Sequence, residues 1–336
     1  MTTPLPAPAR EPAPRWPGTT ARRIPATFKQ QPEDFVVREK LPFAASGAGE
    51  HLYLEIEKRG LGTPELARML ADAHGIEHVD VGFAGMKDKQ AVTRQWFSLR
   101  GVDAFDEVLE AWPELQVLQT TRHQHKLRRG MLAGNSFQIL LRDVPPSEDP
   151  TPVLVRLSAE GAPNYFGAQR FGWDNFSLAS AWLKDRRRRR VSRFKEGLYR
   201  SVVRSYLFNE VLAARVRESS WQSTLEGDVL DERGLPTAPL WGRGRTATTE
   251  GALSIERAAL APYAELLEGL EHAGLKQDRR SLVLRAGNLS WCRDTDGNLA
   301  VSFFLPAGQY ATSFLGDAFA LTEGGESASE LMEVLP

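Results

Sequence analysis

The chain has 336 residues, with 28 Gly, 21 Pro, 8 Trp and one cysteine, Cys292. This length suits about two domains of roughly 150 residues each, and an apolar fraction of 42% is typical of packed cores. A single cysteine excludes an internal disulfide and a cysteine-rich metal site. The sequence has no apolar run near the roughly 20 residues that span a bilayer and no apolar signal segment. We therefore expect a cytoplasmic protein without a membrane association.

The net charge of −1 conceals an uneven distribution. Residues 181–204 carry ten Lys or Arg against two acids, a local charge of +8, whereas residues 316–336 carry five acids and no base. Such asymmetry often accompanies nucleic-acid binding. Charge alone leaves open the alternative of two unrelated solvated stretches.

The first 23 residues are expected to be a disordered Pro-rich tail, because six prolines precede Thr19 and large apolar side chains are nearly absent. Structure is expected to begin near Ile24. Apolar or alternating runs then predict strands at 35–39, 51–56, 79–84, 95–99 and 136–141.

Three helices are predicted in the first half of the chain. Thr63 before Pro64 indicates an N-cap with proline at the first helical position, and Gly75 ends that helix. Apolar residues at i, i+3, i+4 and i+7 predict a second helix at 103–112. A third is predicted at 151–161.

The second half begins with a helix-rich region, 161–286, and returns to strands near the end. Runs at 289–291 and 299–305 are joined by 294–298, whose Asp-Gly pair is a strong hairpin signal. Strands at both ends and a helix-rich middle indicate one domain inserted into another.

Several motif searches fail. The chain has no G-x-x-x-x-G-K-[ST] loop, no G-x-G-x-x-G and no H-E-x-x-H motif. His123 and His125 offer two metal ligands, but they lie beside Arg128 and Arg129 with no third His or Cys nearby. A phosphate-facing strand is the preferred interpretation of this segment.

Asp88 stands between Lys87 and Lys89, just after an apolar strand. Neighbouring cations favour the charged form of a carboxyl group, as a nucleophile or base requires. On an extended chain, however, the lysines would point to the face opposite Asp88, so this benefit requires a turn. Taken alone, the segment is more typical of a solvated hairpin tip.

Five stretches, in order, resemble the motifs of the TruD family of tRNA pseudouridine synthases. The Asp88 stretch reads Ala84–Lys89, followed by Ala91–Thr93, Gln95 and Trp96–Phe97. The other four are Pro32–Val37, Gly134–Phe137, Pro163–Gly172 and Leu305–Ser313. The resemblance runs from about Ile24 to Leu315, and chance agreement of all five in this order is negligible. Gly316 and Asp317 depart from the basic-acidic helical end that is usual in the family.

The resemblance implies an α+β fold with a mixed, mainly antiparallel sheet of the pseudouridine-synthase type. The catalytic domain would comprise 24–160 and 287–336, the latter with an acidic C-terminal tail. The inserted helix-rich α/β TRUD domain would occupy 161–286.

The implied activity is isomerisation of a tRNA uridine, typically uridine 13, to pseudouridine. Asp88 would act at the ribose, by attack on C1′ or by removal of the C2′ proton. The resemblance implies no metal, nucleotide or redox cofactor. It implies tRNA as the partner, and we expect a monomer with no obligate protein partner.

By the same resemblance, Phe35, Asn135 and Tyr310 fall on substrate-contacting positions, with Phe137, Lys29 and Lys87 as further candidates. A flipped uracil can stack on an aromatic ring and bond to an amide that both donates and accepts. Without the resemblance, Phe35 would be taken as a core residue, Asn135 as a turn residue and Tyr310 as a half-buried loop residue.

The basic run in the expected insertion provides candidates for RNA-backbone contacts, which give salt-dependent affinity. They are Arg186, Arg187, Arg188, Arg189 and Arg190, together with Arg128 and Arg129 outside the insertion.

Two other classes of function were weighed. An RNA-binding protein or RNA chaperone on the same scaffold has no use for a carboxylate facing a polyanion, so Asp88 argues against it. A different RNA enzyme, such as a methyltransferase, should carry a Gly-rich cofactor loop, which the sequence lacks.

Overall fold

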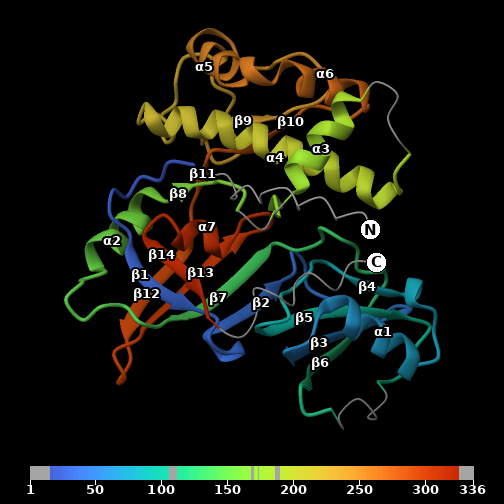
Figure 1. Ribbon diagram of the computed structural model, residues 1–336. Coiled ribbons are helices and arrows are strands. Elements are labelled where there is room, and N and C mark those ends of the chain that lie inside the picture. The colour runs from blue at the N-terminus through green and yellow to red at the C-terminus, as the bar shows by residue number, and fades with distance from the viewer. Residues whose placement is uncertain (1–15, 106–111, 168–169, 173, 186–189, 325–336) are drawn as a thin grey trace, which may run out of the picture. The chain divides into compact units, whose positions relative to one another are not determined.

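The computed structural model describes residues 16–105, 112–167, 170–172, 174–185 and 190–324 (Figure 1). The chain divides into two compact units, each described here by itself. The sheet unit comprises residues 23–154, 286–311 and 319–336, and the helical unit comprises 1–22, 155–285 and 312–318. Among the described residues, no helix is long and apolar enough to cross a bilayer.

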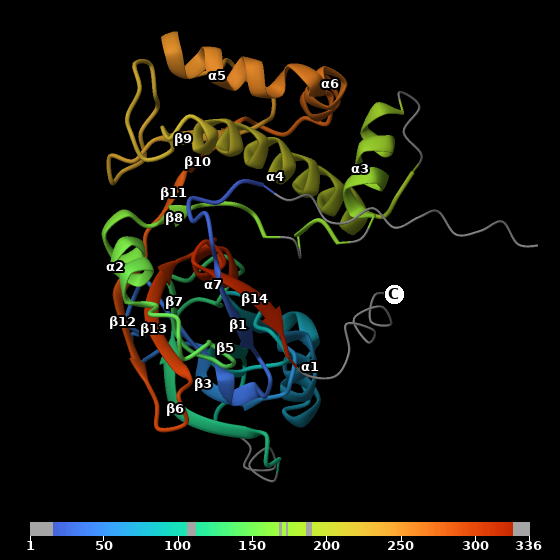
Figure 2. The ribbon, with the colours of Figure 1, turned by 60° about the vertical axis from the view of Figure 1, so that its left-hand side comes forward.

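The sheet unit is built on an eight-stranded mixed sheet in which only β2 and β5 pair in parallel. The strand order along the sheet is β12 (Gly287–Arg293), β13 (Leu299–Pro306), β7 (Gly134–Leu141), β2 (Phe35–Lys40), β5 (Val92–Arg100), β3 (His51–Arg59) and β6 (Leu115–His123), with β4 (Val81–Phe83) also on β5. The predicted hairpin is present as β12 and β13. A separate parallel pair, β1 (Ile24–Phe28) and β14 (Phe319–Glu323), lies side by side in Figure 2.

Helix α1 (Thr63–Ala73) covers one face of this sheet. Its Leu66 and Leu70, both 0% exposed, pack in one core cluster with Leu54 and Phe97 from β3 and β5. Burial of such leucine or phenylalanine side chains stabilises the fold by about 1.5–3 kcal/mol each. The core therefore fixes α1 to β3 and to β5, the strand that follows the Asp88 loop.

The N-cap of α1 is Gly62 rather than the predicted Thr63. Thr63 is instead the first helical residue, and its fully buried hydroxyl contacts residues outside the helix. Two other expected elements also differ. The strand predicted at 79–84 is reduced to β4 after a 3-10 turn at His78–Asp80, and most of the helix predicted at 103–112 lies outside the described residues.

The helical unit is organised around the 25-residue helix α4 (Arg193–Arg217). Helices α3 (Asn175–Lys184) and α5 (Glu250–Leu260) and strand β9 (Thr237–Leu240) contact α4, and α6 (Ala264–His272) contacts α3. Strand β9 pairs with β10 (Asp278–Ser281), and β8 (Ala162–Pro163) pairs with β11 (Val283–Leu284). The remaining helices, α2 (Thr151–Glu160) and α7 (Ala311–Leu315), each run across a unit boundary.

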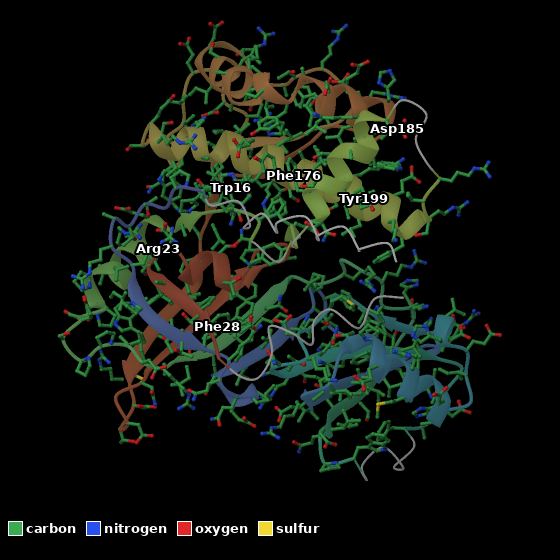
Figure 3. The ribbon with its side chains drawn as sticks, viewed as in Figure 1. Trp16, Arg23, Phe28, Phe176, Asp185 and Tyr199 are labelled. Atoms are coloured by element: carbon green, nitrogen blue, oxygen red, sulfur yellow. The ribbon has the colours of Figure 1, made fainter. Side chains whose placement is uncertain are left out.

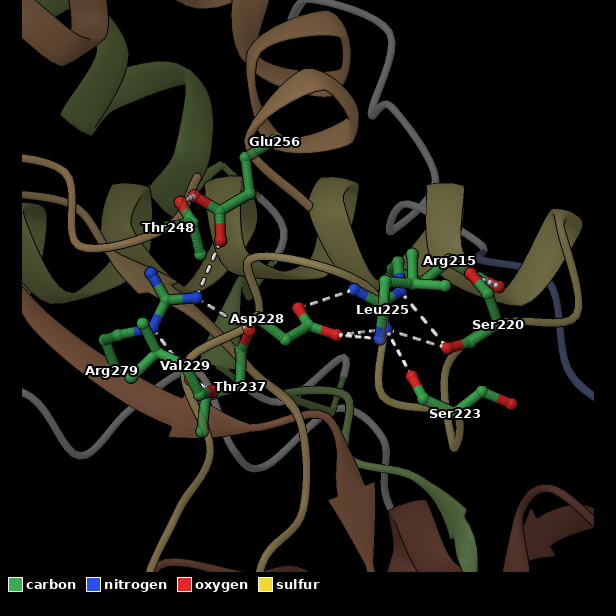
Figure 4. A network of polar contacts seen from close by, with 10 residues as sticks. All are labelled: Arg215, Ser220, Ser223, Leu225, Asp228, Val229, Thr237, Thr248, Glu256 and Arg279. Atoms are coloured by element: carbon green, nitrogen blue, oxygen red, sulfur yellow. Dashed lines mark hydrogen bonds and ion pairs between the residues drawn. The ribbon is translucent and has the colours of Figure 1, made fainter. Parts of the chain in front are cut away.

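The loop after α4 is held by a buried ion pair (Figure 4). Arg215 donates to both carboxylate oxygens of Asp228, at 2.9 and 3.0 Å, and its guanidinium also donates to the carbonyl oxygens of Ser220 and Ser223. The side chains of Arg215 and Asp228 are only 3% and 1% exposed. The charges are thus buried together with hydrogen-bond partners, the condition under which buried charges are tolerated.

Of the tail expected to be disordered over 1–23, residues 16–23 are described, with 16–20 half-buried and 21–23 exposed, while 1–15 lie outside the described residues. Trp16, labelled in Figure 3, belongs to the helical unit. Its ring packs against those of Tyr165, Phe171 and Tyr206, and its indole N–H donates to Glu210 at 2.8 Å. One large aromatic ring is enough to anchor a polar segment, because it buries a large apolar area.

Candidate active site

The strands β2, β7 and β13 place the predicted aromatic and amide residues on one face of the sheet. Val37 lies opposite Phe137, and Glu39 opposite Asn135, across the β2–β7 pair. The rings of Phe35 and Phe137 lie 6.0 Å apart, and both side chains are buried, at 5% and 7% exposed. We call these two buried rings the floor of the site. Because both are buried, they leave little area for contact with a ligand.

Lys29 and Asp88 meet beside this floor. Lys29 follows β1 with a φ of 54°, a left-handed conformation that costs energy for a side chain without special stabilisation. Its ammonium lies 2.9 Å from Oδ2 of Asp88 and 3.4 Å from Oε1 of Glu323, and 4.7 Å from the ring centroid of Phe35. The Lys29 side chain is 3% exposed, whereas that of Asp88 is 52% exposed. A buried cation therefore holds a carboxylate that is open to solvent.

Lys87 forms its ion pair with Glu39. Its ammonium lies 2.5 Å from Oε2 of Glu39, and the two side chains are 5% and 0% exposed. Burial raises the pKa of Glu39, and the ammonium of Lys87 opposes that rise. This buried ion pair anchors the Asp88 loop to β2, and the substrate contact expected of Lys87 stays a prediction.

Asn135 is the second residue of β7, and its side-chain oxygen is buried without a hydrogen-bond partner among the residues that the structure describes. A buried acceptor left unsatisfied costs about 1–3 kcal/mol, which a ligand donor would recover. Tyr310 is half-buried in the turn after β13. This turn begins where Leu305 and Pro306, at the end of β13, pair with Asn135 and Gly134 of β7.

The exposed Arg128 and Arg129 lie in the turn between β6 and β7. The guanidinium of Arg129 lies 4.7 Å from the ring centroid of Phe83, and the N–H of Gly130 donates to the carbonyl oxygen of Ala84 at 2.8 Å. This turn thus lies against the start of the Asp88 loop. His123 packs instead on Phe43, with ring centroids 4.9 Å apart.

Among the arginines of the basic run, Arg190 is described and exposed in the helical unit, while Arg186–Arg189 lie outside the described residues. No cluster of three or more His, Cys, Asp or Glu side chains that could hold a metal ion occurs in the described part of the chain.

The structure adds residues to the site that the sequence analysis did not name as candidate site residues. Glu39 pairs with Lys87, Glu323 pairs with Lys29, and Thr63 and Gln95 bond the loop before Asp88. For Glu39 and Gln95 a signal was available, because each continues the inward-facing alternation of its strand with a polar residue. Buried polar side chains of this kind need partners, which makes them informative.

Comparison with known proteins shows extensive similarity. A family model described as tRNA pseudouridine synthase D (TruD) matches residues 18–179. The tRNA pseudouridine synthase D of Methylococcus capsulatus is 42% identical over 316 residues, covering 86% of this chain and 89% of the relative. The protein of that name from Chromohalobacter salexigens is 40% identical over 331 residues, covering 90% and 95%.

A solved structure shares the fold. A crystal structure from Methanosarcina mazei, described as a tRNA pseudouridine synthase D, has a TM-score of 0.69 and covers 90% of this chain and 95% of that one. At 22% identity this likeness concerns the fold alone. It confirms the expected α+β class with a mainly antiparallel sheet.

Proposed function

We propose, from the premise that the chain belongs to the tRNA pseudouridine synthase D (TruD) family, that Asp88 is the catalytic group of its reaction. The family isomerises uridine to pseudouridine in tRNA, and the chain is an isomerase of this kind. The finer proposal concerns the residues, the target uridine and the absence of a cofactor. The target that we propose is uridine 13.

The observation that carries the proposal is the ion pair between Lys29 and Asp88, at 2.9 Å. Because Asp88 is 52% exposed, its carboxylate is accessible to a ribose, while the buried ammonium limits the directions in which it can point. Fixed orientation of a reacting group is a main source of enzymatic rate enhancement.

The reaction breaks the bond between C1′ and N1 of the uridine and forms one between C1′ and C5. The proton on C5 is released, and N1 gains a proton. Asp88 would act either by attack on C1′, as a nucleophile, or by removal of the C2′ proton, which gives a glycal. Substrate and product are isomers, so the net reaction requires neither a redox partner nor a nucleotide.

Base recognition would use the face of the sheet next to Asp88. A uridine must leave its stack to reach this carboxylate. Asn135 would accept the uracil N3–H with its unsatisfied oxygen and donate its amide N–H to a uracil carbonyl. Tyr310, which is half-buried, would stack on the base, and the Phe35 and Phe137 floor would support the strands that carry Asn135.

Binding of the tRNA backbone would use exposed cations in each unit. In the sheet unit these are Arg128 and Arg129, whose turn bonds to Ala84 at the start of the Asp88 loop. In the helical unit Arg190, before α4, and Arg193 and Lys195, in the first turn of α4, are exposed. We include Arg186–Arg189 in this proposal because they continue the same basic run. Phosphate contacts of this kind would weaken with rising salt.

The test is tritium release from tRNA transcripts that carry 5-tritiated uridine, with the native chain, Asp88→Ala and Asp88→Asn. We expect release from the native chain alone, with tRNA affinity retained in both variants. If uridine 13 is the target, a transcript with cytidine at position 13 should lose the tritium release that the unchanged transcript gives. Equal release by the native chain and Asp88→Asn would overturn the assignment of Asp88, and release unchanged by the cytidine would overturn that of the target.

A further inference from the structure

The backbone just before Asp88 is bonded to two fully buried side chains from other elements. The N–H of Lys87 donates to Oγ1 of Thr63 at 2.9 Å, and the Nε2 group of Gln95 donates to the carbonyl oxygen of Gly85 at 2.6 Å. Thr63 and Gln95 are joined to each other by a buried hydrogen bond of 2.9 Å. Thr63 starts α1 and Gln95 lies in the middle of β5, so the bonds connect the loop to the core of the sheet unit.

The direction of each hydrogen bond in this set is fixed. Because Oγ1 of Thr63 accepts from the Lys87 N–H, the Thr63 hydroxyl has its proton available for Oε1 of Gln95. The Gln95 amide nitrogen then faces the Gly85 carbonyl oxygen and donates to it. One arrangement of donors and acceptors therefore satisfies both side chains, both of which are 0% exposed.

We propose that Thr63 and Gln95 are positioning residues that set the orientation of Asp88 by fixing the backbone at Gly85 and Lys87. The proposal rests on the proposed function of Asp88. A third tether supports it, since Lys87 is also held by its ion pair with the fully buried Glu39. The loop is thus fixed up to Lys87. Asp88, whose carboxylate is exposed, is the next residue in the chain.

The expected effect is on chemistry and not on binding, because neither side chain is accessible to RNA. Thr63→Val removes the hydroxyl at nearly constant volume, and Gln95→Met replaces the amide with an apolar side chain of similar length that cannot donate to Gly85. Misplacement of a reacting group by about 1 Å can cost about 100-fold in rate. We expect single-turnover tritium release to slow by about 10- to 100-fold in both variants, with the tRNA Kd within about threefold of the native value.

Two variants separate positioning from general loss of stability. Thr63→Ser keeps the hydroxyl and should restore most of the rate. Ser98→Ala is the matched control, because Ser98 is also on β5, is 0% exposed and accepts a backbone N–H, that of Leu127, at 2.9 Å. It should lower the thermal midpoint to a similar extent and leave the single-turnover rate near native.

Amide hydrogen exchange at Lys87 supplies a readout that does not depend on activity. Exchange there should accelerate in Thr63→Val and stay slow in Thr63→Ser and Ser98→Ala. A near-native rate of chemistry in Thr63→Val, or equal slowing in Ser98→Ala, would overturn the proposal. If the native chain released no tritium, the proposed function would fail, and unchanged Lys87 exchange in Thr63→Val would separately refute the tether.

Discussion

The ion pair of Lys29 and Asp88 joins a buried cation to an exposed carboxylate, with side chains 3% and 52% exposed and 2.9 Å between the charged atoms. The cation is fixed by its own surroundings, since it also lies 3.4 Å from Glu323 and 4.7 Å from the ring centroid of Phe35. The fixed ammonium of Lys29 therefore restricts the orientation of the Asp88 carboxylate. We therefore expect the loss of this contact to slow the proposed reaction.

Lys29→Met should slow isomerisation by about 10- to 100-fold, because the carboxylate loses its fixed partner and samples orientations that cannot react. The measurement is single-turnover tritium release at saturating enzyme. Lys89→Met is the control, since Lys89 is 68% exposed and 4.0 Å from Glu65, and it should retain the native rate of chemistry. Native rates in Lys29→Met would show that Asp88 needs no such partner.

Asn135 gives a prediction about the base. If its buried oxygen accepts the uracil N3–H, Asn135→Ala should lower kcat/KM by about 10- to 100-fold, equivalent to the roughly 1–3 kcal/mol of an unmade buried hydrogen bond. Asn135→Asp keeps an acceptor and loses the donor, so it should also be impaired. Asn298→Ala, in the β12–β13 turn, is the control. An unimpaired Asn135→Ala enzyme would exclude this residue from base recognition.

How much of the site could be predicted from the sequence depends on how far apart in the chain the contacting residues lie. The strand at 35–39 was predicted from its run of strand-favouring residues, and the two-residue period of a strand places Phe35 and Glu39 on the same face of β2. The resemblance brought Lys29 and Asp88 into one candidate list, but it did not imply their ion pair. That pair depends on a left-handed residue after β1, and neither propensity nor spacing predicts a contact across 59 residues.

Thr63 illustrates a second limit. Thr before Pro is a common N-cap signal, yet Gly62 caps the helix and the Thr63 hydroxyl bonds Lys87 and Gln95. Local sequence shows that a hydroxyl is present but not which of several competing partners it will take. Tertiary contacts decided this case.

The pair of Asp34 and Arg142 gives a prediction about stability. The guanidinium donates to both oxygens of the fully buried carboxylate, at 2.9 and 2.7 Å, and this bonding raises the pKa of Arg142. Asp34→Asn should lower the free energy of unfolding by about 3 kcal/mol, since it leaves a cation without its charge partner. Urea unfolding would measure this loss.

A matched exposed pair serves as the control for that prediction. Arg59 and Glu33 have side chains 56% and 45% exposed, so Glu33→Gln should change stability little. Equal losses in Asp34→Asn and Glu33→Gln would contradict the importance of burial.

Lys58 makes stability depend on pH in an unusual direction. Its side chain in β3 is 0% exposed and donates to the carbonyl oxygen of Leu61, and burial lowers its pKa from 10.5 to about 8. The native state therefore binds fewer protons than the unfolded state between about pH 8 and 10.5. The free energy of unfolding therefore rises with pH in that window as far as Lys58 determines it. Below about pH 8 the full destabilisation by the buried charge is present.

Lys58→Met should consequently be more stable than the native chain at pH 7, by up to about 3 kcal/mol for a shift of this size at 1.36 kcal/mol per unit. The advantage should shrink steadily from pH 8 and be nearly lost at pH 10.5, where the lysine is neutral in the folded state and half of it is neutral in the unfolded state. Urea unfolding of both proteins across this range measures the difference. Lys184→Met, at a side chain 51% exposed, should show no such trend. A difference that stays constant from pH 7 to 10.5 would mean that Lys58 does not lose its charge in the folded state.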